Sequence, residues 1–197
     1  MNKPVFGFDI DDVVFDTFSV IKHVFMTEHG IDVGTPTRFG LEEECNGKMA
    51  TSQVSDAIDK ALSYIDMNKP IHGALEFLRE YQLVTKNKII FITSRRLDMK
   101  NPTEELLSKW IPNLDYVVFY AKDKSKGDFA VENGIQFFID DRVKYCVDVA
   151  SRGIVALMPR RSWNILYQDP LCTNKVVRVR DYDDINLIFN TFLHYQM

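Results

Sequence analysis

The chain has 197 residues, of which 46% are hydrophobic and 26% are charged, and its formal net charge is −4. This is the composition of an ordinary globular protein, and it argues against a nucleic-acid polymer as the main partner, because such binders usually carry a basic face. The first apolar run is short and ends in acids, so we expect neither a signal peptide nor a membrane span. No two of the three cysteines form a C-x-x-C pair, so we expect no structural zinc and no disulfide framework, and a cytoplasmic location.

Short apolar, β-prone runs recur along the chain and alternate with amphipathic segments. The strands that we expect lie at residues 4–10, 88–93, 116–120, 136–140, 154–158 and 175–180. The helices that we expect between and after them lie at residues 74–81, 103–110, 128–133, 143–151 and 183–194. The strand runs are nearly continuous in apolar residues, which is typical of strands covered on both faces. These patterns predict an α/β fold with a Rossmann-like, doubly wound, mainly parallel sheet.

One interval breaks this alternation. Roughly 75 residues separate the first expected strand from the second, far more than a crossover connection needs. Residues 16–30 and 52–66 have helical patterns, and a Gly-, Thr- and Pro-rich break separates them. We therefore interpret residues 16–68 as a small helical cap over the carboxyl edge of the sheet, and we assign residues 1–15 and 69–197 to the α/β core domain.

Side chains that can act on phosphate follow four of the expected strands, and ligands bind at the carboxyl ends of strands in doubly wound sheets. Carboxylates follow the first and fourth strands, hydroxyls follow the second, and lysines follow the third. Carboxylate oxygens are natural ligands of Mg²⁺, and lysine and hydroxyl groups stabilise charge on phosphoryl oxygens. The mixture indicates a crevice for a phosphate, a hard cation and a nucleophile. The residues concerned are Asp9, Asp11, Asp12, Thr93, Ser94, Lys122, Lys124, Lys126, Asp140 and Asp141.

In the same order along the chain, these residues resemble the four motifs of the haloacid dehalogenase superfamily. Residues 9–13, with the sequence DIDDV, resemble the first motif, D-x-D-x-[VT]. Residues 93–94 (TS) resemble the second, Lys126 before a helix the third, and residues 140–141 (DD) the fourth. The resemblance implies a Rossmann-like core with a cap. It also implies hydrolysis of a small phosphate monoester through an aspartyl-phosphate, with Mg²⁺ as the cofactor.

The resemblance also implies a role for each residue. Asp9 would be the nucleophile and a metal ligand, and Asp11 would be the general acid and base and lend its backbone carbonyl to the metal. Lys126 and Thr93 would hold the phosphoryl group. The superfamily's dehalogenases lack the second aspartate of the first motif, so we expect no carbon–halogen substrate. The other implied residues are Asp140 as a metal ligand, Asp141 as a supporting acid, and Asp12 and Ser94 at the phosphate.

Further segments resemble the 5′(3′)-deoxyribonucleotidase and nucleotidase branch of the superfamily, which implies a nucleoside monophosphate as the substrate. They include PIHGALEFL, FITSR, FIDDR and VRVRDYDDI. The chain departs from that branch at two places. His72 stands where the branch has proline, and Arg95 and Arg96 follow the second motif without the expected proline.

Several assignments keep an alternative. Lys124 is the alternative to Lys126 as the phosphate lysine. Phe18 and Phe39 are candidates for stacking on a base, although cap core explains them equally well. Trp163 closes the edge of the site or packs under the last helix, and we favour packing. The competing functions are a sugar-phosphate phosphatase, a phosphoacceptor module of the receiver type, and a ligand-binding protein without catalysis. In receivers the acceptor aspartate follows the third strand, which disfavours that alternative.

Overall fold

A computed structural model describes residues 3–36, 41, 45, 48–121, 124–166 and 175–195. Within these residues, six strands form one sheet in the order β3-β2-β1-β4-β5-β6, and every neighbouring pair is parallel. The sheet grows in one direction from β1 to β3 and in the other from β4 to β6, so its switch point lies between β1 and β4. The strands are β1 (Phe6–Phe8), β2 (Ile89–Thr93), β3 (Tyr116–Tyr120), β4 (Phe137–Ile139), β5 (Val155–Pro159) and β6 (Val176–Val179).

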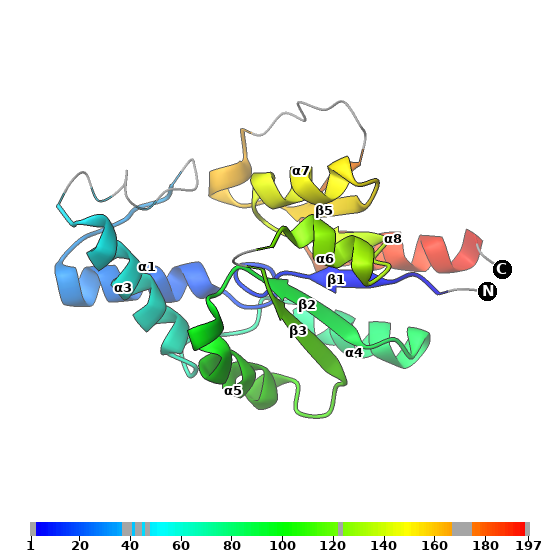
Figure 1. The fold of residues 1–197 in the computed structure, drawn as a ribbon, viewed down its shortest axis with the longest axis horizontal. Helices are drawn as coiled ribbons and strands as arrows, with labels where there is room; N and C mark the ends of the chain where they lie inside the picture. Colours follow the sequence, from blue (N-terminus) through cyan, green and yellow to red (C-terminus); the bar gives the residue numbers. More distant parts are fainter. Residues whose placement is uncertain are drawn as a thin grey trace.

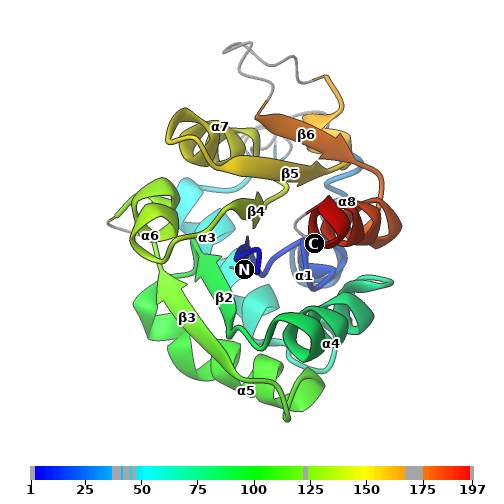
Figure 2. The same cartoon turned by 90° about the vertical axis from the view of Figure 1, so that its right-hand side faces the viewer.

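Helices cover both faces of the sheet (Figure 2). Three helices, α4, α5 and α8, contribute to the hydrophobic cluster around Phe6 and Phe8, whereas α6 and α7 contribute to the cluster around Ile92 and Phe138. The predicted α/β fold with a doubly wound parallel sheet is therefore confirmed, including its sixth strand. The helices are α4 (Ala74–Thr85), α5 (Lys100–Trp110), α6 (Lys126–Glu132), α7 (Val143–Ser151) and α8 (Tyr182–Tyr195).

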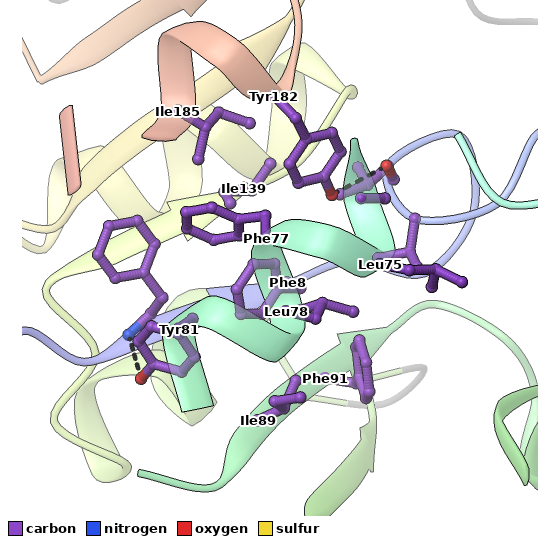
Figure 3. Packing of buried hydrophobic residues seen from close by; sticks show 14 of the residues in the cluster. Phe8, Leu75, Phe77, Leu78, Tyr81, Ile89, Phe91, Ile139, Tyr182 and Ile185 are labelled. Carbon is purple, nitrogen blue, oxygen red and sulfur yellow. Dashed lines mark hydrogen bonds between the residues drawn. The ribbon is translucent and has the colours of Figure 1, made fainter. Parts of the chain in front are cut away.

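The cluster beneath α4 and α8 is rich in aromatic side chains (Figure 3). The ring of Phe6 stacks on that of Phe137, with 4.8 Å between their centroids, and full burial of such a side chain contributes about 1.5–3 kcal/mol. Two tyrosine hydroxyls in this cluster also form hydrogen bonds with the backbone. Tyr81 Oη accepts a hydrogen bond from Phe6 N at 3.1 Å, and Tyr182 Oη donates to Val13 O at 3.1 Å. The helices thus hold both β1 and the loop that follows it, which fixes where the strand ends.

Two further helices, α1 (Thr17–His29) and α3 (Thr51–Ser63), extend away from the sheet on the side opposite the N-terminus (Figure 1). Asp16 begins α1, because its carboxylate accepts a hydrogen bond from Ser19 N at 3.2 Å. The two helices share a hydrophobic cluster that is separate from the two clusters of the sheet. The division of the chain into core and cap at residues 16 and 68 stays a prediction. The shared cluster includes Val20, Val24, Phe25, Val54, Ala57 and Ala61.

Two of the three cysteines can be described. Cys45 and Cys146 are buried and form no disulfide bond within the described part of the chain, and Cys172 lies outside it. Among the described helices, none combines the length and the apolar character needed to cross a bilayer. The cytoplasmic location stays a prediction.

Candidate active site

Three buried carboxylates gather at the switch point of the sheet. Asp9 directly follows β1, and Asp140 and Asp141 directly follow β4, which is the neighbour of β1. Parallel neighbours end at the same edge of a sheet, so the three side chains converge there. One oxygen of each lies within 4.8 Å of the others, and each residue is at most 2% exposed. This spacing is short enough for the three side chains to share one cation.

A buried lysine lies between two of these acids. Ser125 caps α6, which puts Lys126 at the first position of the helix. Lys126 Nζ lies 2.9 Å from Asp9 Oδ1 and 2.8 Å from Asp140 Oδ2. Burial would lower the pKa of Lys126, but the charges of Asp140 and Asp9 outweigh burial and raise that pKa above its ordinary value. Lys124, the alternative phosphate lysine, forms an ion pair outside this group.

The acid group has the properties of a divalent-cation site. Burial raises the pKa of Asp9 to about 7, against the opposing charge of Lys126 and with the repulsion of Asp140. Burial and the charge of Asp140 also raise the pKa of Asp141 well above its ordinary range. Lys126 Nζ is the ion-pair partner of Asp9 Oδ1, and its single positive charge faces three carboxylates. A divalent cation on these oxygens would relieve the remaining repulsion among the carboxylates, so the residues fit Mg²⁺.

The side chain of Asp11 is held by an arginine instead. Arg95 Nη2 donates to Asp11 Oδ1 at 2.6 Å, and Arg95 Nε donates to Asp11 Oδ2 at 3.0 Å. Thr17 Oγ1, at the start of α1, donates to Asp11 Oδ1 at 2.7 Å. Burial would raise the pKa of Asp11, but the charge and hydrogen bonds of Arg95 outweigh it and hold that pKa below its ordinary value. Asp11 is therefore an ionised, firmly oriented group in the free protein.

The other predicted phosphate ligands have different surroundings. Thr93 is fully buried, and its hydroxyl accepts a hydrogen bond at 3.1 Å from the backbone N–H two residues later. Ser94 lines the pocket described below. Asp12 lines it too, its carboxylate accepts a hydrogen bond from Phe18 N at 2.9 Å, and burial raises its pKa to about 8. Their roles at a phosphate stay predictions.

A tryptophan connects the acid group to α1. Trp163 lies in a short 3₁₀ helix (Ser162–Asn164) after β5, and its indole Nε1 donates to Asp141 Oδ2 at 2.6 Å. Asn164 Nδ2 donates to the carbonyl of Asp141 at 2.8 Å. On its other side, Trp163 contacts the ring of Phe18, with 5.0 Å between the centroids. The sequence favoured packing under the last helix for Trp163. The structure shows that Trp163 also contacts Asp141 at the site.

A pocket of about 220 Å³ lies between the sheet edge and the helices α1 and α3. Asp9, Asp11 and Asp141 line its floor together with Ser94. The opposite wall is mainly apolar, and Phe18 belongs to it, whereas Phe39 lies outside the described residues. The apolar side chains of that wall are Phe18, Ile21, Pro36, Leu41, Ile58 and Leu62.

Sequence reasoning missed the partners that orient these acids. Arg95 directly follows the hydroxyls at the end of β2, so the rule about strand ends pointed to it, but no role was assigned. Arg161 and Trp163 follow β5, a strand end to which the rule was not applied; Arg161 was not considered, and for Trp163 packing was favoured over a place at the edge of the site. Arg161 Nη2 donates to the carbonyl of Asp12 at 2.7 Å and so supports the loop after β1. The same rule, applied to the fifth strand, would have pointed to Arg161 and favoured the position of Trp163 at the site.

No protein-family model and no curated protein matches the sequence. Solved structures match over almost the whole chain. A HAD-superfamily hydrolase of subfamily IA from Geobacter sulfurreducens aligns with 95% of this chain and 96% of its own, at 14% identity and a TM-score of 0.61. A haloacid dehalogenase-like family hydrolase from Streptococcus pneumoniae aligns with 95% of this chain and 98% of its own, at 16% identity and a TM-score of 0.64. The chain has the haloacid dehalogenase fold.

A third structure with the haloacid dehalogenase fold is a candidate HAD-hydrolase from Bacillus subtilis bound to magnesium. It aligns with 96% of this chain and 100% of its own, at 13% identity and a TM-score of 0.62. At these identities the likeness establishes the haloacid dehalogenase fold and neither a reaction nor a substrate. The nucleotidase branch of the superfamily stays a prediction.

Proposed function

We propose that the protein is a Mg²⁺-dependent phosphomonoester hydrolase in which Asp9 is the nucleophile. The observation that carries the proposal is the position of Asp9. Its carboxylate lies in the floor of a pocket, beside the positive charge of Lys126 and two further acids. A carboxylate nucleophile needs such a charge nearby, because it must approach an anionic phosphate. The hydrolases that share the fold support the proposal.

The reaction would proceed in two steps, in which Asp9 is the nucleophile and Asp11 the general acid and base. In the first, an oxygen of Asp9 attacks phosphorus, the bond from phosphorus to the leaving oxygen breaks, and Asp11 gives that oxygen a proton. In the second, Asp11 takes a proton from water, the water oxygen attacks phosphorus, and the bond to Asp9 breaks. The pKa of Asp11 is held low in the free protein, so Asp11 takes up its proton when the negative phosphate approaches and raises that pKa.

Mg²⁺ would be held by carboxylate oxygens of Asp9, Asp140 and Asp141, together with the backbone carbonyl of Asp11. When bound, it offsets the repulsion between the Asp9 carboxylate and the phosphate. Lys126 acts with it, because its raised pKa keeps the ammonium charged and able to stabilise phosphoryl oxygens. The magnesium-bound structure with the same fold supports this choice of ion.

A nucleoside monophosphate is the substrate that we favour. A base is flat and largely apolar on its faces, and the pocket offers the ring of Phe18 on its apolar wall, next to the ring of Trp163. Stacking on an aromatic ring contributes about 1–3 kcal/mol per base. A sugar phosphate would leave this apolar wall unused. The pocket is also smaller than the roughly 300–1,000 Å³ of typical ligand sites, which favours a small ester over a phosphorylated protein.

A hydrolysis screen with Mg²⁺ tests both the proposed reaction and the proposed substrate class. The panel contains nucleoside monophosphates, deoxynucleoside monophosphates and sugar phosphates, and the readout is released phosphate. We expect turnover, highest with a nucleoside or deoxynucleoside monophosphate. We expect Asp9→Asn to lower turnover by more than about 10³-fold with an unchanged circular dichroism spectrum.

Each other outcome has a definite meaning. Full activity of Asp9→Asn would exclude the proposed nucleophile. A clear preference for sugar phosphates would replace the substrate class and leave the mechanism. A stable phosphorylated protein that does not turn over would favour the receiver-type alternative. Inactivity towards the whole panel would contradict a hydrolase function.

A further inference from the structure

Arg95 lies inside the protein, in the loop between β2 and a short 3₁₀ helix (Leu97–Met99). Its side chain has no exposed surface. Its Nη1 donates to Thr103 Oγ1 on α5 at 3.1 Å, and the Thr103 hydroxyl in turn donates to Met99 O at 2.7 Å. The guanidinium is thus anchored on one side by α5. Its other edge, with Nε and Nη2, is the edge that binds Asp11.

The contacts of Asp11 leave one accepting position on its carboxylate. An ionised carboxylate has about four such positions, two on each oxygen. Asp11 Oδ1 uses both, for Arg95 Nη2 at 2.6 Å and for Thr17 Oγ1 at 2.7 Å. Among the described residues, Oδ2 has the single donor Arg95 Nε, at 3.0 Å. The side chain of Asp11 is 25% exposed and lines the pocket, so its open position belongs to Oδ2.

We infer that Arg95 is a positioning residue that, together with Thr17, fixes Asp11 so that Oδ2 is the oxygen that exchanges protons with the leaving group and with water. The inference rests on the proposed function. In the first step the proton passes from Oδ2 to the leaving oxygen as its bond to phosphorus breaks. In the second step a proton of the attacking water returns to Oδ2.

The planar fork of arginine is what makes this possible. Two parallel N–H bonds hold both oxygens of a carboxylate in one plane, whereas the ammonium of lysine is a point charge that does not set the orientation. Arg95→Lys therefore keeps the buried positive charge and removes the orientation. This separates a positioning role from a purely electrostatic or structural one.

The test compares two monoesters that differ in their need for an acid. A nucleoside monophosphate has a poor leaving group that must be protonated, whereas dinitrophenyl phosphate has a good one that leaves without a proton. The readout is kcat/KM, because it reports the steps up to the release of the leaving group. For Arg95→Lys we expect a loss on the order of 10²-fold with the nucleoside monophosphate and less than about 3-fold with the aryl ester.

Arg180→Lys is the matched control. Arg180 forms the same kind of fork with Asp184, through Nε to Oδ2 at 2.9 Å and Nη2 to Oδ1 at 2.5 Å, but at the exposed start of α8. We expect kcat/KM for both esters to stay at the wild-type value in this variant. Thr17→Val is a second test, because it removes the other hydrogen bond that orients Asp11. It should cause a smaller loss with the same preference for the nucleoside monophosphate.

Equal losses with both esters in Arg95→Lys would overturn the inference, because a residue that only maintains the structure would not distinguish leaving groups. If circular dichroism shows that Arg95→Lys is unfolded, Thr17→Val decides by the same comparison. A wild-type protein that hydrolyses neither ester would overturn the proposed function and this inference together. An active wild type with uniform losses in the variants would overturn this inference alone.

Discussion

Asp9, Asp140 and Asp141 share one cluster, but different partners hold them. Lys126 contacts the first two and supplies a positive charge. The carboxylate of Asp141 accepts a hydrogen bond from the neutral indole of Trp163 instead. A side chain that donates a hydrogen bond to a metal-binding carboxylate holds that carboxylate in orientation, and removing the donor typically weakens metal binding. Trp163 can therefore be changed without altering the charge of the site.

We expect Trp163→Phe to weaken Mg²⁺ binding on the order of 10-fold, because it keeps an aromatic ring and removes the hydrogen bond to Asp141. Isothermal titration calorimetry measures the dissociation constant directly. Trp110→Phe is the control, since the indole Nε1 of Trp110, on α5, donates to no described residue. An unchanged dissociation constant in Trp163→Phe would show that Asp141 does not contribute to the metal site.

Residues that directly follow an apolar, strand-like run could be predicted from the sequence as site residues. Asp9 and Asp140 directly follow apolar runs, so the strand-end rule placed them at the sheet edge. The choice between Lys126 and Lys124 could not be made in this way, because it depends on which side chain turns toward Asp9. The pair of Asp11 and Arg95 joins positions 84 residues apart, and a single sequence carries no signal for such a contact.

The central strand β1 accommodates a glycine between two phenylalanines. Gly7 pairs with Phe138 on β4, and its Cα faces the side chains of Ile135 and Phe138. A Cβ atom at this position would lie 2.5 Å from Ile135 Cδ1 and 2.8 Å from Phe138 Cδ2. Both distances are shorter than van der Waals contact, so any larger residue must displace these side chains. The end of β1 carries Asp9, so the packing at Gly7 also affects the position of the site.

We expect Gly7→Ala to lower the free energy of unfolding by about 1–3 kcal/mol, the usual cost of overpacking a core. Urea denaturation followed by circular dichroism measures this change. Adding Ile135→Val removes the methyl group that Cβ would meet first, so the double variant should recover part of the loss. Additive losses in the double variant would contradict this steric explanation.

The elements themselves were largely predictable, because their signals are local. Six near-continuous apolar runs became six strands, and the structure changes only their ends. The helix expected to begin at residue 103 begins at Lys100 instead, because the proline at residue 102 is tolerated in the first turn of a helix. The helical segments that became α1 and α3 were predicted, and Phe18 was named among the side chains that line the pocket, but the others were not. Their orientation depends on how α1 and α3 pack against each other and beside the sheet.

Burial of several acids makes the stability of the whole molecule depend on pH. Burial raises the pKa of Asp9 to about 7 and that of Asp12 to about 8. Between about pH 4 and pH 8 the folded protein therefore binds more protons than the unfolded chain, and its stability falls as the pH rises. The lowered pKa of Asp11 acts only below this interval.

In a chelating buffer we expect the free energy of unfolding to fall by at least ~1.4 kcal/mol, the equivalent of one pKa unit, between pH 5 and pH 8. Urea titrations at the two pH values measure it. Mg²⁺ binds the ionised carboxylates, so it should stabilise the protein more at pH 8 than at pH 5. A metal-free protein that is more stable at pH 8 would contradict the raised pKa values.

The central claim for the molecule is that Asp9 attacks a phosphate ester bound in the pocket and becomes phosphorylated during turnover. Rapid acid quenching of the protein with Mg²⁺ and a hydrolysed monoester, followed by peptide mass spectrometry, tests this claim directly. We predict a phosphoryl group on the peptide that contains Asp9, and none on that peptide in Asp9→Asn. A phosphoryl group on another residue of the active enzyme would contradict the claim.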